Sequence, residues 1–155
     1  MSRDPRTVAV AYDHPDAARL IEELQQEYVL RYGGRDDTPV RPAEFAPPKG
    51  LFLAGYLNDE AAACGGWRSH GVTAEIKRMY VRRPARRTGL ARALLAELEQ
   101  TALAAGHTEV ILETGSKQPE AVALYRSAGY TDVPPFGYYA DAPLSIHLGK
   151  RLAGE

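Results

Sequence analysis

Residues Tyr80–Leu95 read YVRRPARRTGLARALL, and this stretch decides how the chain folds. A β-prone run ends, a short basic turn follows, and a helix begins at Gly89 with leucines at every fourth position. The first amides of a helix lack partners within it and lie at the positive end of its dipole. Such an end binds phosphate readily, and a glycine lets the ligand approach the backbone. The turn therefore predicts an anion site, although a solvated basic turn would look the same.

The segments on either side alternate between strand-like and helix-like patterns. Helical periodicity over 13–33 and 119–129 predicts two helices besides the one at 89–105. Apolar and β-branched runs predict strands at 7–12, 51–57, 61–68, 74–81, 109–113 and 145–151. This order predicts an α/β (α+β) fold, with a mixed sheet and helices on its faces, as one domain over 1–155.

Two of these segments bear on the site. Strict alternation along Ala74–Val81 places Ile76, Arg78 and Tyr80 on one face of the sheet. Residues 33–50 are rich in proline and predict a long surface connection. Loops of that length in a compact domain are often functional.

Composition narrows the class of protein. The chain has 155 residues, 45% of them hydrophobic, and a net charge of −1. We therefore expect no nucleic-acid partner and no anionic membrane surface as partner. No apolar run approaches the ~20 residues that span a bilayer, and the first residues do not resemble a signal peptide. The single cysteine, Cys64, fits a reducing compartment, so we expect a cytoplasmic protein with an inert, packed thiol.

Two motifs resemble those of one enzyme family. Arg86–Ala91 (RRTGLA) matches the Gln/Arg-x-x-Gly-x-Gly/Ala signature of the GNAT family of N-acetyltransferases. Gln118–Tyr130 (QPEAVALYRSAGY) resembles the family's Asn-x-x-Ala-x-x-Leu-Tyr-x-x-x-Gly-Phe/Tyr motif, with Gln118 in place of asparagine. The resemblance covers most of the chain from Leu51 onward. It implies the GNAT fold, a mixed sheet of about seven strands flanked by about four helices, in which two parallel strands splay apart.

The resemblance implies acetyl-CoA as the acetyl donor. Its pantetheine arm would bind the backbone of Met79, Tyr80 and Val81, where an N–H could also polarise the thioester carbonyl. The cofactor-binding residues around the pyrophosphate would be Arg86, Arg87, Thr88, Gly89, Leu90, Ala91 and Arg92. Gln118 and Tyr125 would also contact the cofactor. We expect no metal, because His70, His107 and His147 lack a second ligand at metal spacing. For His147, in the last strand, a structural role is favoured over a place in the acceptor cleft.

Three side chains are candidates for proton transfer. Glu75 is the first choice as general base, since its Ala-Glu-Ile context resembles that of the catalytic glutamate in GNAT histone acetyltransferases. Glu113 is the second choice. Tyr125 matches the motif tyrosine that serves as general acid. An ion pair for Glu75 and simple core packing for Tyr125 remain open alternatives.

The sequence indicates the acceptor substrate less clearly than it indicates the acetyl donor. The end of the first helix, the loop to Gly50 and the aromatic stretch 134–141 should wall its pocket, and aromatic rings with a carboxylate suit a cationic amine. The acceptor-binding candidates are Tyr32, Glu113, Phe136, Tyr138 and Asp141. The Pro-Pro-Phe-Gly-x-Tyr stretch resembles that of a bacterial subgroup of small-molecule GNAT proteins, which implies a small-molecule amine acceptor.

Other functions stay open at this level. The chain could acetylate lysines or N-termini of proteins, or bind acyl-CoA without catalysis as a regulatory module. A nucleic-acid-binding domain would rest on the arginines of 82–92 alone, and no binding motif accompanies them. The resemblance also allows a homodimer.

Overall fold

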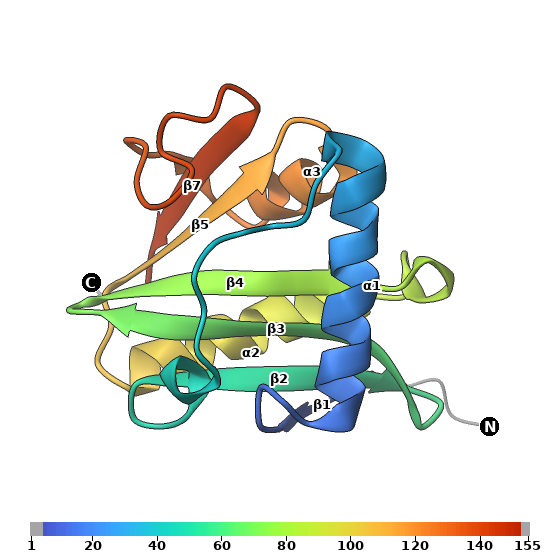
Figure 1. The fold of residues 1–155 in the computed structure, drawn as a ribbon. Helices are drawn as coiled ribbons and strands as arrows, with labels where there is room; N and C mark the ends of the chain where they lie inside the picture. The colour runs from blue at the N-terminus through green and yellow to red at the C-terminus, as the bar shows by residue number, and fades with distance from the viewer. Residues whose placement is uncertain (1–4, 153–155) are drawn as a thin grey trace.

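The computed structural model of the protein describes residues 5–152, so what was predicted for 1–4 and 153–155 lies outside it (Figure 1). Seven strands form one mixed sheet in the order β1-β2-β3-β4-β5-β7-β6. They are β1 (Arg6–Ala9), β2 (Gly50–Leu57), β3 (Glu60–His70), β4 (Thr73–Val81), β5 (Glu109–Gly115), β6 (Thr131–Asp132) and β7 (Ser145–Arg151). The predicted mixed sheet of about seven strands is confirmed.

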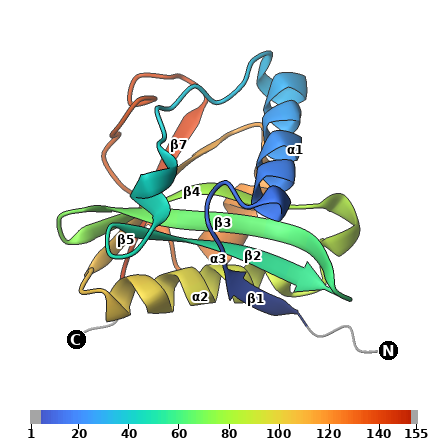
Figure 2. The same ribbon diagram turned by 60° about the horizontal axis from the view of Figure 1, so that its bottom comes forward.

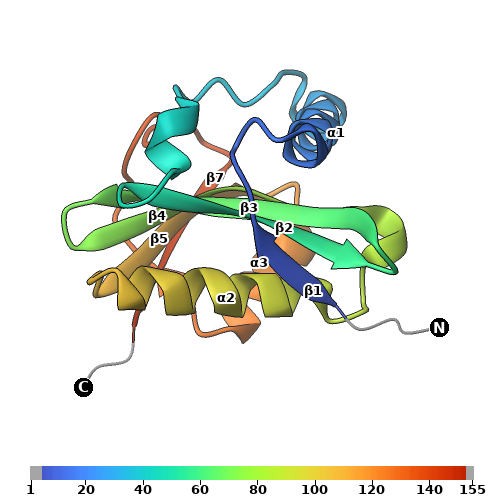
Figure 3. The same ribbon diagram turned by 90° about the horizontal axis from the view of Figure 1, so that it is seen from below.

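Helices cover both faces of the sheet. Within residues 5–152 there are three α-helices rather than about four, and two further turns are 3-10: α1 (Pro15–Tyr32), η1 (Pro42–Phe45), η2 (Arg83–Ala85), α2 (Leu90–Ala104) and α3 (Pro119–Ser127). α1 and η1 lie on one face (Figure 2), and α2 lies on the opposite face (Figure 3). The leucine stripe of α2 (Leu90, Leu94 and Leu98) is fully buried in the core on that side. Because these leucines face the core, they fix the position of α2 on the sheet. They therefore also fix the position of the amides in its first turn.

β4 and β5 are parallel neighbours that separate part of the way along. They pair from Thr73 opposite Glu109 to Ile76 opposite Leu112. Beyond this point β4 continues beside β3 and β5 continues beside β7, so the two strands diverge (Figure 1). The splay expected from the resemblance is therefore present, between residues 77–81 and 113–115.

A bulge in β4 changes which side chains face which helix. The register between β3 and β4 shifts, so that Arg78 and Met79 lie opposite a single residue of β3. Arg78 takes a left-handed backbone conformation with φ of 61°. An extra residue reverses the alternation of the side chains that follow it. Ile76 therefore packs beneath α2 while Arg78 and Tyr80 lie on the α1 face, and the prediction that these three share a face is wrong.

Candidate active site

The N-terminus of α2 has open space beside its N-cap, and the Leu90 amide at the start of the helix donates to the Thr88 hydroxyl at 3.4 Å. Its N-cap, Gly89, has φ of 88°, and a Cβ added there would meet no atom within 4 Å. Arg87 also has a positive φ, of 67°. The Thr88 hydroxyl is engaged by the carbonyl oxygen of Ala85, to which it donates. Amides at the positive end of a helix, with room in front of them, suit a phosphate group.

The arginines around this turn have different partners. Arg86 donates from Nε to the Val81 carbonyl oxygen at 3.1 Å, and its guanidinium lies 3.0 Å from Glu27 of α1. Arg92 donates to the Ser127 hydroxyl at 2.8 Å, on α3. Arg87 is exposed beside the free amides. Arg86 and Arg92 thus tie the turn to α1 and α3, while Arg87 is placed to meet an anion.

A cavity of about 30 Å³ lies between the splayed strands, and this cavity is called the gap from here on. Met79 of β4, Glu113 of β5, and Gln118 and Tyr125 of α3 are among its lining residues. Tyr125 is 5% exposed. Burial, and then the negative charge of Glu113, raise the pKa of the Tyr125 hydroxyl. The hydroxyl is therefore protonated at neutral pH and able to donate its proton.

Two larger cavities lie next to the gap, with volumes of about 330 and 290 Å³. The first cavity lies at the end of α1 and is lined by Tyr28, Tyr32, Asp37 and other residues. The second cavity is lined in part by Glu75 and by the aromatic stretch 136–139. Glu113 lines the first cavity, the second cavity and the gap. The Glu113 side chain therefore borders all three cavities.

The environment of Glu113 suits a base. Burial raises the pKa of its carboxyl group, and the Ser145 hydroxyl, which donates to Oε2 at 2.7 Å, partly opposes that shift. Lys77, which lines the second cavity and the gap, also lowers the pKa. A carboxylate with a raised pKa is a stronger proton acceptor than an ordinary glutamate.

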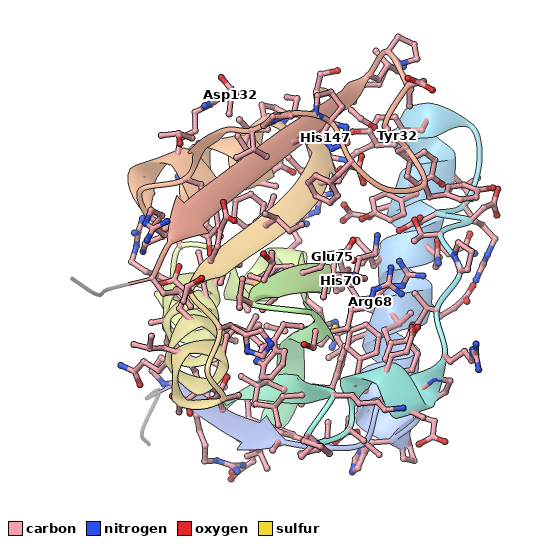
Figure 4. The ribbon with its side chains drawn as sticks, turned by 90° about the vertical axis from the view of Figure 1, so that its left-hand side faces the viewer. Tyr32, Arg68, His70, Glu75, Asp132 and His147 are labelled. Atoms are coloured by element: carbon pink, nitrogen blue, oxygen red, sulfur yellow. The ribbon has the colours of Figure 1, made fainter. Side chains whose placement is uncertain are left out.

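Glu75 lines the second cavity, but its carboxylate is held in an ion pair. Its Oε1 accepts from Arg68 Nε at 3.0 Å and is 2.8 Å from His70 Nε2. Figure 4 shows the three side chains gathered at one place on the sheet. Arg68 also donates to Glu44 of η1 at 2.8 Å. The alternative that the sequence left open for Glu75, pairing with an arginine, describes its contacts, while a role as base stays a prediction.

A buried ion cluster that sequence reasoning missed fixes the segment after α1. The Asp36 carboxylate pairs with the Arg78 guanidinium and lies 3.6 Å from Lys77 Nζ. Their side chains are 9%, 5% and 6% exposed. Burial raises the pKa of Asp36, but the two cations outweigh it and the net pKa is lowered. Adjacent acids in the loop and adjacent cations on β4 were the available signal, but their pairing depends on the bulge.

Besides Glu113, which lines both larger cavities, the predicted acceptor residues fall into three groups. Tyr32 lines the first cavity, and its hydroxyl donates to Gln118 Oε1 at 3.2 Å. Phe136 and Tyr138 line the second cavity. Asp141 is exposed and belongs to neither lining.

Two tyrosines of the cavities were not singled out from the sequence. Tyr28 lies one helical turn before Tyr32 and lines both the first cavity and the gap, so the spacing of four residues could have identified it. Tyr139 lines the first and second cavities. Its hydroxyl accepts from the backbone amide of Asp37 at 2.8 Å. The aromatic stretch is thus joined to the loop after α1 across the cavities.

Comparisons with known proteins agree with this geometry. The profile of the Acetyltransferase (GNAT) family matches residues 17–130. The IAA acetyltransferase of Azospirillum brasilense is 35% identical over 150 residues, which cover 94% of this chain and 98% of the relative. A Klebsiella pneumoniae protein assigned as an acyl-CoA N-acyltransferase is 28% identical, with a TM-score of 0.81 and coverage of 96% and 98%.

A solved structure of lower identity shows the same fold. The PaiA N-acetyltransferase of Thermoplasma acidophilum, in complex with coenzyme A, is 14% identical with a TM-score of 0.70, covering 96% of this chain and 99% of that one. The family profile spans both motifs that the sequence presents, Arg86–Ala91 and Gln118–Tyr130. The chain therefore belongs to the GNAT family and is an acetyl-CoA-dependent N-acetyltransferase.

Proposed function

We propose that the chain moves acetyl from acetyl-CoA to a primary amine of a small molecule, by direct attack of the amine in a ternary complex. Glu113 is the general base and Tyr125 the general acid. The observation that carries this proposal is the position of Glu113, which borders the gap and both larger cavities. An amine that enters either cavity meets this carboxylate at the edge of the gap.

The donor side rests on the turn before α2 and on the splay. The open amides around Gly89, with Arg87 beside them, fit the pyrophosphate. The unpaired edge of β4 at Met79–Val81 fits the pantetheine arm. A Thermoplasma protein of the same fold has been solved in complex with coenzyme A, which supports coenzyme A as the carrier of the acetyl group. The bound donor supplies an activated acetyl thioester.

The chain's own groups supply the proton transfers. An alkylamine is mostly protonated at neutral pH, so it must lose a proton before it attacks. The Glu113 carboxylate accepts that proton, and its raised pKa favours the transfer. Tyr125 is protonated at neutral pH, as an ordinary tyrosine is, and it gives that proton to the departing sulfur. This assignment replaces Glu75, whose carboxylate is occupied by Arg68, with the second choice from the sequence.

The shape of the acceptor side supports a small molecule. The first cavity, of about 330 Å³, is walled by α1, the loop after it and residues 139–145. Three tyrosine rings and two carboxylates (Tyr28, Tyr32, Tyr139, Asp37 and Glu113) are part of its lining. This combination suits a cation of limited size better than a protein segment.

Release of free thiol from acetyl-CoA tests the proposal directly. The purified chain is assayed over amino acids, polyamines, aminoglycosides and peptides, together with IAA, the compound in the name of the Azospirillum relative. Turnover with a small amine, with kcat lost in Glu113→Gln, supports the proposal. Turnover with peptides alone would point to a protein acetyltransferase. Binding of acetyl-CoA with no turnover over the whole panel would point to a regulatory module.

A further inference from the structure

Two buried histidines of this chain differ in their hydrogen bonding. His107 is 4% exposed, and its two ring nitrogens lie 3.0 Å from the Ala102 carbonyl oxygen and 2.9 Å from the Ser69 hydroxyl. His147 is 7% exposed, and neither of its ring nitrogens has a hydrogen-bond partner among residues 5–152. Buried polar groups are nearly always paired, because an unpaired one loses its bonds to water without replacement. His107 shows how the chain meets this rule, so the exception at His147 needs a reason.

The position of His147 in the sheet offers a reason for its unpaired ring nitrogens. It lies on β7 directly opposite Glu113 of β5 in the antiparallel register. Directly opposite residues project from the same face of a sheet, with Cβ atoms about 5 Å apart. The imidazole therefore emerges beside the carboxylate that borders both acceptor cavities. Figure 4 shows His147 on β7, apart from the group formed by Arg68, His70 and Glu75.

The aromatic ring that packs against His147 also lines the second cavity. The Phe136 ring meets the imidazole edge to face, with centroids 5.0 Å apart, and Phe136 itself lines that cavity. A phenyl ring packs against the imidazole but offers its nitrogens no hydrogen-bond donor or acceptor. Gly137, the next residue, has φ of 75° and lines the cavity as well. A glycine in this conformation lets the backbone beside Phe136 rotate at low cost, so a ligand could displace the ring.

We propose that His147 is an acceptor-binding residue, reached when the acceptor displaces Phe136, and that it selects amines carrying a second hydrogen-bonding group. This inference rests on the proposed function, in which the amine reaches Glu113. The spacing of about 5 Å between the two strand positions suits a hydroxyl or carboxylate about three carbons from the nitrogen. The acceptor class is therefore the amino alcohols and amino acids of that length, and plain alkylamines are poor acceptors.

Two amines of nearly equal size test this selection. The wild type is assayed with 3-aminopropan-1-ol and with butan-1-amine, and kcat/KM is measured for each. A hydrogen bond to a group that is otherwise left unpaired should favour the amino alcohol by about tenfold. In His147→Phe, which keeps an aromatic ring of similar shape, the ratio should fall close to one. His107→Phe is the matched control, since it also removes a buried histidine and should leave the ratio unchanged.

The wild-type protein provides a second test that needs no variant to fold. With histidine labelled by ¹⁵N and coenzyme A present, the ring nitrogen signals of His147 should shift on addition of 3-aminopropan-1-ol and stay in place with butan-1-amine. The signals of His107 serve as the internal reference. A wild-type ratio near one, or a ratio unchanged in folded His147→Phe, or immobile His147 signals at saturating amino alcohol, would overturn the inference. Absence of thiol release with every amine would instead contradict the proposed function.

Discussion

Replacing Glu113 with glutamine keeps the size of the side chain and removes its ability to accept a proton. General base catalysis contributes about 10²–10⁴-fold, so Glu113→Gln should lower kcat/KM for the acceptor by at least about 10²-fold. Burial raises the pKa of Glu113, so the carboxylate becomes protonated and inactive at a higher pH than an ordinary glutamate would. The wild-type rate should therefore fall on the acid side of neutrality, and Glu113→Gln should lose that acidic limb.

Ser145 allows the size of the effect to be worked out. Its hydroxyl donates to the Glu113 carboxylate at 2.7 Å and stabilises the charged form. A hydrogen bond to a charged group contributes about 1.5–3 kcal/mol, and about 1.4 kcal/mol corresponds to one pH unit. Ser145→Ala should thus move the acidic limb upward by about one to two pH units while leaving the rate at its plateau largely unchanged.

The assay is the pH dependence of kcat/KM from thiol release, for the wild type, Glu113→Gln, Ser145→Ala and Glu75→Gln. Glu75→Gln is the matched control, a glutamate-to-glutamine change in the second cavity. It should lower stability, because Arg68 loses one of its two carboxylate partners, but it should keep the acidic limb. If Glu113→Gln retained the wild-type limb and Glu75→Gln abolished it, the base would be Glu75 and the reasoning from cavity position would be refuted.

Three further changes test other parts of the structure. Tyr125→Phe should lower kcat by about 10²-fold, and an unchanged kcat at every pH would remove Tyr125 from the mechanism. Asp36→Asn leaves Arg78 buried without its carboxylate and should lower the free energy of unfolding by about 3 kcal/mol in urea denaturation. The pKa of Asp36 is lowered in the folded state, so this difference should be complete at neutral pH and vanish as the pH falls through that pKa. Gly115→Ala would drive a Cβ into the Tyr32 hydroxyl, so steady-state kinetics should show a raised KM for the acceptor and an unchanged KM for acetyl-CoA.

The start of α2 and the turn before it, which we propose bind the donor, could be predicted from sequence because their residues are contiguous. The basic turn, Gly89 and the leucine stripe of α2 follow one another along the chain, so local rules place the free amides. The parallel pairing of β4 with β5 follows from the helix between them, and the family resemblance adds the splay. What local rules could not show is that Arg86 and Arg92 reach α1 and α3, because those partners lie far along the chain.

The lining of the first cavity could be predicted only in part, because its residues come from distant segments: Tyr32 and Glu113 were named from the sequence, but Tyr28 and Asp36 were not. Tyr28, Asp36, Glu113 and Tyr139 meet in or beside one cavity, yet they belong to α1, the loop after it, β5 and the loop before β7. The bulge in β4 also reverses the faces of the residues after it, so strict alternation misplaced Arg78. Neither effect has a periodic signature that a window along the sequence can detect.

The sequence by itself determined the family, the donor and the order of strands and helices, since each of these depends on neighbours within about 15 residues. The tertiary structure decided the surroundings of the two candidate bases, Glu75 and Glu113. Glu75 and Glu113 are both acids on adjacent strands, but Arg68 occupies Glu75 while the diverging strands leave Glu113 at the junction of three cavities. It also decided that both ring nitrogens of His107 have hydrogen-bond partners, while those of His147 have none within residues 5–152. A buried imidazole depends for its partners on the groups that the fold packs against it.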